Sequence, residues 1–384
     1  MLIIVSGALA NKPGNGGNAW TRLNWVLGLR RLGFETHFIE QIAAPAWVDR
    51  HGRPTQPRDS VNLVYFSEVM ERFGLQRHAH LICDHGTTLY GASATALRKL
   101  AQSADLLVNI SGHLGFAPLK NAPRKRVFFD DDPGYTQFWH AAGQLGEKLR
   151  GYDCYFTIGA NIGTRQSVIP LEGIDWRPMR VPVVLEQWPA VAVQEFSNFS
   201  TVASWRGPYG SVEFGGKTYG QKVHEFRNFI ELPAKTGLPF EIVLNIDPAD
   251  AKDRQSLEQA GWRLLSPSVV ASPDQYREFV QRSSAEFSVA QSIYVQTNSG
   301  WFSDRTAVYL ASGRPALVQN TGFSDHLPTG EGVIAFTTME EAVAGAHALA
   351  ANYPRHCRAA RAMAEEYFDS DKVLRNLLAE IASS

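Results

Sequence analysis

The chain has 384 residues, of which 44% are apolar and 20% are charged, and its formal net charge is -1 at pH 7. The length predicts two domains rather than one, and the composition is that of a globular protein. The near-neutral balance argues against a nucleic-acid or membrane-surface partner, which a basic patch would indicate.

Cysteine, histidine and apolar patterns narrow the possibilities further. Cys83, Cys154 and Cys357 lie far apart and predict no disulfide framework, which fits a reducing compartment. The 11 histidines form no cluster with zinc spacing, so no metal site is expected. No apolar run reaches the roughly 18 residues of a membrane span, and the short apolar start lacks the basic residues of a signal peptide. We therefore expect a cytoplasmic protein.

Strand and helix patterns alternate along the first half of the chain, which is typical of a parallel sheet with helices on both faces. Short apolar runs predict strands, and apolar residues at helical spacing predict helices. The predicted strands are 2–7, 35–40, 105–112, 124–132 and 152–160, and the predicted helices are 18–33 and 95–104. The segment 176–191 contains three prolines and little periodicity, so we place a linker between domains at 182–191.

A second alternation follows the linker. Its predicted strands are 199–205, 239–247, 285–291 and 315–320, and its helices are 221–232, 272–284 and 304–312. A last amphipathic helix at 373–382 is expected to pack back on the first domain. The predicted fold class is α/β, with two doubly wound, Rossmann-like domains at 1–182 and 190–365 facing a central cleft, and a C-terminal helix within 366–384. Ligands of such sheets bind at the carboxyl ends of the strands.

A glycine-rich loop follows the first strand. Gly16, Gly17 and Asn18 open the next helix, whose free N–H groups and dipole favour an anion. The spacing is not G-x-G-x-x-G, so a dinucleotide site is not supported. The loop either touches a sugar or diphosphate or is a flexible turn.

Polar residues follow two further strands of the first domain. His113 sits between glycines after the strand at 105–112, and Asp130, Asp131 and Asp132 end the strand at 124–132. Three adjacent carboxylates raise at least one pKa if they are partly buried. Asp130, Asp132 or His113 could act as a general base or bind hydroxyl groups. A structural histidine and a solvated turn are the alternatives.

The second domain carries cations at its strand ends. Arg206 and Lys222 flank a glycine-rich loop that follows the strand at 199–205, an arrangement suited to a diphosphate. The cap and first turn of the helix at 304–312 would direct N–H groups at the same anion, with side-chain donors to add. The residues concerned are Ser303, Asp304, Arg305 and Thr306. A solvated basic loop and an ordinary capped helix are the alternatives.

The order of these motifs resembles the GT-B glycosyltransferases, especially the glycosyltransferase 4-like group, over nearly the whole chain. GNGGNAWTRLNWVLGLRRLGFETHFI resembles their opening loop and helix, and ADLLVNISGH resembles the strand that leads to an active-site histidine, here His113. ASWRGPYGSVEFGGKTYGQKVHEF resembles the loop that gives Arg206 and Lys222 to the donor diphosphate. SGWFSDRTAVYLASGRPALVQNTGF resembles the segment that holds the nucleotide sugar.

The resemblance implies a metal-independent transferase that moves a sugar from a nucleotide diphosphate sugar, UDP or dTDP, to a small-molecule or glycan acceptor, without a cofactor. The chain departs from the family in one respect. Retaining members carry two glutamates eight positions apart, where this chain has Gly300 and Val308. The donor must therefore be held differently, and the stereochemical outcome stays open. A nucleotide-sugar epimerase and an inactive partner or sugar-binding protein are the alternative functions.

Overall fold

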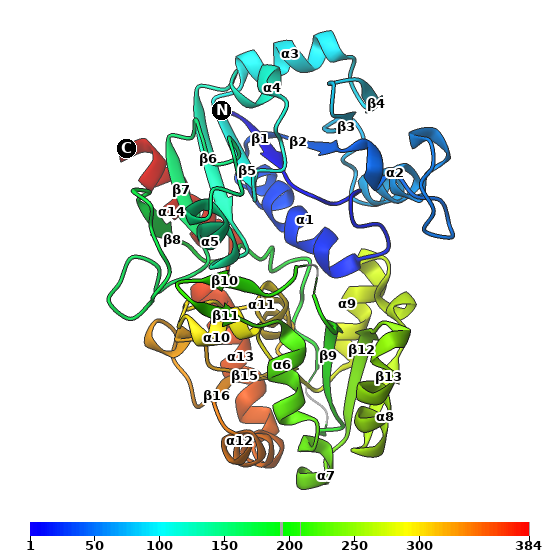
Figure 1. Cartoon of the computed structure of the whole chain (residues 1–384), viewed down its shortest axis with the longest axis vertical. Helices are drawn as coiled ribbons and strands as arrows, with labels where there is room; N and C mark the ends of the chain where they lie inside the picture. Colours follow the sequence, from blue (N-terminus) through cyan, green and yellow to red (C-terminus); the bar gives the residue numbers. More distant parts are fainter. Residues whose placement is uncertain (193–194, 208, 384) are drawn as a thin grey trace.

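The computed structural model describes residues 1–192, 195–207 and 209–383. Each half of the chain forms a lobe built on its own sheet, and the two lobes are stacked along the long axis (Figure 1). This arrangement confirms the predicted α/β class with two doubly wound sheets facing one another.

The first lobe contains an eight-stranded sheet with the order β4-β3-β2-β1-β5-β6-β7-β8. All neighbours are parallel except β3 and β4. Its strands are β1 (Leu2–Ser6), β2 (Glu35–Ile42), β3 (Ala79–Cys83), β4 (Thr88–Tyr90), β5 (Leu106–Ile110), β6 (Lys125–Asp130), β7 (Cys154–Thr157) and β8 (Trp176–Pro178). Its helices are α1 (Gly16–Arg31), α2 (Val61–Arg72), α3 (Ala94–Ser103), α4 (Ala117–Lys120) and α5 (Tyr135–Ala141), with short 3-10 turns η1 (Ala44–Ala46) and η2 (Pro57–Asp59).

The second lobe contains a six-stranded parallel sheet with the order β13-β12-β9-β14-β15-β16. Its strands are β9 (Phe199–Ser204), β12 (Phe240–Asn245), β13 (Trp262–Leu265), β14 (Ala285–Ser288), β15 (Ala316–Gln319) and β16 (Val333–Phe336). Its helices are α6 (Lys222–Phe226), α7 (Leu232–Thr236), α8 (Ala251–Gln259), α9 (Pro273–Arg282), α10 (Ser292–Gln296), α11 (Asp304–Ala311), α12 (Met339–Ala351) and α13 (Tyr353–Tyr367), with η3 (Arg227–Phe229), η4 (Pro248–Asp250), η5 (Pro267–Val270) and η6 (Phe323–Asp325).

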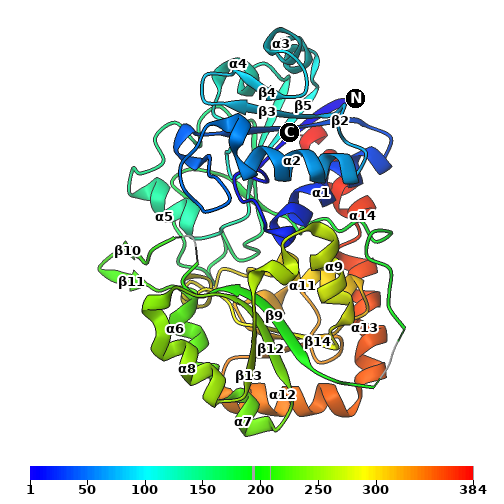
Figure 2. The same cartoon turned by 90° about the vertical axis from the view of Figure 1, so that its right-hand side faces the viewer.

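The chain passes between the lobes twice, and the two crossings lie side by side. The N–H of Val183 donates to the carbonyl of Phe368 at 2.7 Å, and the N–H of Ser370 donates to the carbonyl of Val183 at 2.9 Å. The second crossing leads into α14 (Ser370–Ser383), which lies in the first lobe beside α1 (Figure 2). A Cβ added to Gly28 of α1 would lie 2.7 Å from the Leu374 side chain, so the two helices pack at close range.

The lobes share a continuous apolar interface through α1 and α9. Trp20 of α1 is buried, packs 4.9 Å from Trp188, and donates its indole N–H to the carbonyl of Pro273 at 2.8 Å. Aromatic side chains contribute large contact areas at low entropic cost, and a buried indole N–H needs such a partner. The cleft between the two lobes is therefore closed where α1 meets α9.

The glycine-rich loop predicted after β9 contains an antiparallel hairpin, β10 (Val212–Phe214) with β11 (Lys217–Tyr219). Its aromatic residues reach the first lobe. Phe138 of α5 packs 4.8 Å from Phe214 and 4.8 Å from Tyr219. The hairpin thus closes a second edge of the cleft.

Candidate functional site

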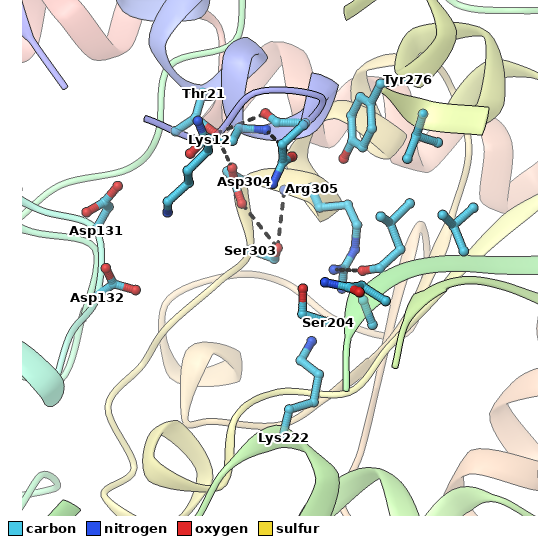
Figure 3. A pocket seen from close by; sticks show the side chains of 18 of the residues that line it. Lys12, Thr21, Asp131, Asp132, Ser204, Lys222, Tyr276, Ser303, Asp304 and Arg305 are labelled. Atoms are coloured by element: carbon cyan, nitrogen blue, oxygen red, sulfur yellow. Dashed lines mark hydrogen bonds between the residues drawn. The ribbon is translucent and has the colours of Figure 1, made fainter. Parts of the chain in front are cut away.

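A cavity of about 560 Å³ lies between the carboxyl ends of the two sheets. The first lobe contributes the loop after β1, the start of α1 and the loop after β6, and the second lobe contributes the ends of β9 and β12 with the first residues of α6 and α11. Figure 3 shows polar side chains converging on it from both lobes. Of the predicted site residues, Gly17, Asn18, Asp132, Lys222, Ser303, Asp304 and Arg305 line this cavity, whereas Gly16, His113, Asp130, Arg206 and Thr306 do not.

The first carboxylate after β6 belongs to the core of the first lobe. Asp130 is fully buried and accepts hydrogen bonds from the hydroxyls of Thr136 at 2.6 Å and Thr157 at 2.8 Å and from the amide of Gln137 at 2.9 Å. Burial raises the pKa of Asp130, while these hydrogen bonds lower it. Its oxygens anchor α5 and β7 to the strand, so Asp130 cannot reach a substrate in this arrangement.

Asp131 and Asp132 both line the cavity, but their partners differ. Asp131 accepts a hydrogen bond from the guanidinium of Arg22 at 3.0 Å and a short one from the hydroxyl of Ser111. An adjacent cation keeps such a carboxylate in ion-paired form. Asp131 is therefore held by side chains of its own lobe.

Asp132 instead faces the second lobe. It accepts hydrogen bonds at 3.3 Å from the hydroxyls of Tyr209 and Tyr294. Burial, followed by the neighbouring charge of Asp131, raises the pKa of Asp132 to about 7, against the opposing effect of Lys12. A carboxylate with this pKa is suited to accept a proton near neutral pH.

His113 lies beside the cavity rather than in its lining. It follows Ser111 and Gly112, which both have left-handed φ values, 49° and 64°, so the chain turns sharply after β5. Burial, then the nearby charges of Arg22 and Lys148, lowers the pKa of His113 well below its ordinary value. The imidazole is therefore neutral at physiological pH.

The first turn of α11 joins the two lobes. The Ser303 hydroxyl accepts the N–H of Arg305 at 3.2 Å and caps the helix, as the sequence suggested. The Asp304 carboxylate accepts the hydroxyl of Thr21 in α1 at 2.5 Å. Thr306 is fully buried and its hydroxyl has no hydrogen-bond partner among the described residues, so its side chain is turned into the core.

Arg305 is held by the second lobe itself. Its guanidinium forms an ion pair with Glu286 at 2.5 Å and also donates to the carbonyl of Val202 at 2.7 Å and the hydroxyl of Ser288 at 2.9 Å. These contacts fasten the ends of β9 and β14. The side-chain donors expected for a diphosphate are thus largely occupied. Because the Ser303 hydroxyl accepts the N–H of Arg305, the backbone N–H groups of Ser303 and Asp304 remain as the anion-binding feature of this turn.

Lys222 points into the cavity from the second lobe, as Lys12 does from the first (Figure 3). Within the described part of the chain, no carboxylate lies within 4.0 Å of its amine to form an ion pair. Burial, then the charge of Arg305, lowers the pKa of Lys222 to about 7, with Glu286 opposing. A desolvated amine of this kind gains much from a nearby anion.

Arg206 is directed away from the cavity. Its half-exposed side chain forms a two-pronged ion pair with Asp250, with one contact of 2.8 Å from Nε to Oδ2. The pair holds the loop after β9 against η4. Sequence spacing could not show this contact, because Asp250 lies 44 residues further along the chain.

Gly16 and Gly17 of the first loop allow the second lobe to approach α1 closely, although Gly17 also lines the cavity. A Cβ on Gly16 would lie 2.2 Å from the carbonyl oxygen of Ser272, and one on Gly17 would lie 2.8 Å from the ring of Tyr276. Asn18 donates its side-chain amide to the carbonyl of Ala8 at 2.7 Å. The glycines therefore permit α1 to dock on the second lobe.

Gly300, where the resembled family carries a glutamate, has no room for a side chain. Its φ is +73°, and a Cβ there would lie 2.7 Å from the N atom of Asn161 in the first lobe. Val308, the second of these positions, is buried in the core. The fold therefore leaves no space for a glutamate at position 300 and buries position 308 in the core.

Sequence reasoning did not single out several lining residues, namely Lys12, Thr21, Arg22, Asp131, Ser204 and Tyr276. Lys12 lies in the glycine-rich loop and Asp131 lies between two predicted residues, so the predicted residues beside them could have identified both as candidates for the site. In the described chain, no group of three His, Cys, Asp or Glu side chains could hold a metal ion. No described helix has both the length and the apolar character needed to cross a bilayer.

Comparison with known proteins identifies structures that share the fold. No protein-family model and no curated protein sequence matches the chain. Among solved structures, HepE of Anabaena in complex with UDP-glucose is 10% identical, with a TM-score of 0.62 and full coverage of both chains. An alpha-glucosyltransferase in complex with UDP is 12% identical, with a TM-score of 0.60 over 99% of both chains, and it has also been solved with UDP and a 13-mer DNA. Sucrose-phosphate synthase from Thermosynechococcus elongatus is 11% identical, with a TM-score of 0.57 and full coverage of both chains.

These similarities extend over both lobes and confirm the GT-B fold that the order of motifs predicted. At 10–12% identity they establish the fold alone.

Proposed function

We propose that the chain is a glycosyltransferase that moves a sugar from a nucleotide diphosphate sugar to an acceptor. The observation that carries this proposal is the arrangement of one cavity. A free cation and a helix N-terminus on the second lobe, Lys222 and the start of α11, face the Asp132 carboxylate on the first lobe. A group that stabilises a leaving diphosphate is thus opposite a group that can accept a proton.

The donor would bind mainly to the second lobe. Lys222 and the backbone N–H groups of Ser303 and Asp304 would hold the diphosphate, where negative charge increases as the sugar leaves. A side pocket of about 280 Å³, which shares Asn245 and Pro267 with the main cavity, would take the base, with leucine side chains and the polar groups of Asn245 and Ser266 in its lining. The cation and the helix dipole can do this work without a metal, and the neighbours solved with UDP favour a UDP sugar over a dTDP sugar.

Asp132 would act as the general base toward the acceptor. The acceptor hydroxyl loses its proton to Asp132, its oxygen forms a bond to the anomeric carbon, and the bond from that carbon to the diphosphate oxygen breaks. A base placed opposite the leaving group predicts inversion of the anomeric configuration. His113, which is neutral, would at most hold a hydroxyl. We expect a small molecule or a glycan as acceptor.

A nucleotide panel tests the proposal. Thermal unfolding is followed with UDP, dTDP, GDP and their sugars, with and without EDTA, because a ligand at 100 times its dissociation constant adds about 2.7 kcal/mol of stability. Stabilisation by one nucleotide that EDTA leaves unchanged supports a metal-independent transferase. No stabilisation by any of them contradicts the diphosphate site.

Product analysis then separates the remaining functions. Incubating the stabilising nucleotide sugar with mixtures of small-molecule, glycan and DNA acceptors should give a glycosylated product from the first two. An altered sugar still attached to its nucleotide would indicate an epimerase, and binding without turnover would indicate a binding protein. Retention at the anomeric carbon, measured by NMR, would contradict the role of Asp132.

A further inference from the structure

A second cavity, of about 200 Å³, lies where the chain crosses between the lobes. One wall is aromatic, with Phe302 at 5.1 Å from Phe323 and 5.3 Å from Phe368, measured between ring centres. Ile158 and Val181 also line the main cavity, so they separate the two spaces. None of the charged residues of the main cavity reaches this one.

One arginine, Arg180, lines this cavity together with the aromatic wall. Its Nη2 donates to the carbonyl of His326 at 2.8 Å, and its guanidinium lies 4.9 Å from the ring centre of Tyr367. Within the described residues, no carboxylate forms an ion pair with Arg180, and burial lowers its pKa. A guanidinium has five N–H donors, so most of them are available to a ligand.

We propose that this cavity binds a small carboxylate with an apolar body. The carboxylate would accept two parallel hydrogen bonds from Arg180, and the body would lie against Phe302, Phe323 and Phe368. A partly buried cation gains from an anionic partner, whereas an inorganic anion would leave the aromatic wall unused. The volume equals that of roughly seven water molecules at about 30 Å³ each, which suits one ring rather than a nucleotide.

Such a ligand would touch both lobes at once. The lining comes from the first lobe at Ala160, from both crossings at Arg180 and Phe368, and from the second lobe at Phe302 and Leu327. Phe302 directly precedes the cap of α11, which lines the main cavity. The bound carboxylate would thus favour the closed arrangement without occupying the donor site.

Met179 offers a local probe, because it lines this cavity and the chain has only 5 methionines. Protein carrying 13C-methyl methionine is titrated with benzoate, and the Met179 signal is assigned with Met179→Leu. We expect benzoate to shift this signal with a dissociation constant on the order of 1 mM, as suits so small a ligand. Benzamide, which has the same shape without the charge, should bind at least tenfold more weakly.

Two variants and one competition complete the test. Arg180→Gln should weaken benzoate binding at least tenfold, while Arg165→Gln, at an exposed arginine, should leave it unchanged. A saturating UDP sugar should not displace benzoate. No shift of Met179 by benzoate, an equal shift by benzamide, or displacement by the UDP sugar would each overturn the proposal. The comparison of benzoate with benzamide needs only the wild-type protein, so it stands even if Arg180→Gln fails to fold.

Discussion

Donor binding should be accompanied by uptake of a proton on Lys222. Burial and Arg305 lower the pKa of this amine to about 7. At pH 8 it would be only about 10% charged, whereas a diphosphate beside it would restore a pKa near the ordinary value of about 10.4. Binding at pH 8 should therefore take up about 0.9 proton, and binding at pH 6 only about 0.1. Donor affinity should accordingly fall about tenfold per pH unit above pH 7.

Isothermal titration calorimetry in two buffers of different ionisation enthalpy measures this uptake directly. A nucleotide sugar is the better titrant, because its diphosphate gains no proton near neutral pH. Lys222→Met should remove the uptake at pH 8 and weaken binding roughly 10- to 150-fold, the equivalent of about 1.5–3 kcal/mol for a hydrogen bond to a charged group. Lys217→Met, on the exposed part of the hairpin, is the matched control and should change neither quantity.

Equal uptake at pH 8 in the wild type and in Lys222→Met would refute the reasoning. Asp132 is the other group of the cavity with a pKa near 7. The variant Asp132→Asn therefore shows whether any residual uptake belongs to that carboxylate.

Three further predictions follow from the structure. Asp132→Asn should lower turnover about 100-fold or more with little loss of donor affinity. At saturating donor, the wild-type rate should rise with pH through about 7, since the ionised form of Asp132 is the base. Burial lowers the pKa of His80 to about 4, so this imidazole binds its proton more weakly in the folded than in the unfolded chain. The free energy of unfolding should therefore fall as pH drops from about 6.5 to 4, by at most about 3 kcal/mol. Urea unfolding of His80→Gln should show a smaller fall than the wild type, whereas His51→Gln, at an exposed site, should show the same fall. Gly16→Ala should weaken lobe closure by about 1–3 kcal/mol and increase the radius of gyration in small-angle scattering, while Gly210→Ala, which has open space, should do neither.

The sequence predicted the two sheets because buried parallel strands are short apolar runs that can be recognised locally. It did not predict α2, β3 or β4, and it did not predict the hairpin after β9. The short strands β10 and β11 are held by Phe138 of the other lobe rather than by their own apolar pattern. The turn itself did leave a local signal, because Gly215 and Gly216, with left-handed φ values of 58° and 75°, form a two-residue loop between the strands. Only the long-range packing on Phe138 leaves none.

The candidate site was predicted only in part for the same reason. Three consecutive aspartates point in different directions at the end of a strand, and the chain pattern alone could not distinguish buried Asp130 from Asp132, which lines the cavity. Arg206 and Arg305 have the residue type of diphosphate ligands, but Asp250 and Glu286 bind them. Lys222 remains available because no carboxylate was placed beside it in the described structure.

The position of α14 beside α1 has a consequence for synthesis. Gly28 and Leu374 pack at close range although 346 residues separate them in the chain, as their numbers show. The lobe that leaves the ribosome first is therefore completed last, after the whole second lobe has been made. We expect the nascent first lobe to expose the apolar side of α1 throughout that interval, a state in which chaperones bind and aggregation begins.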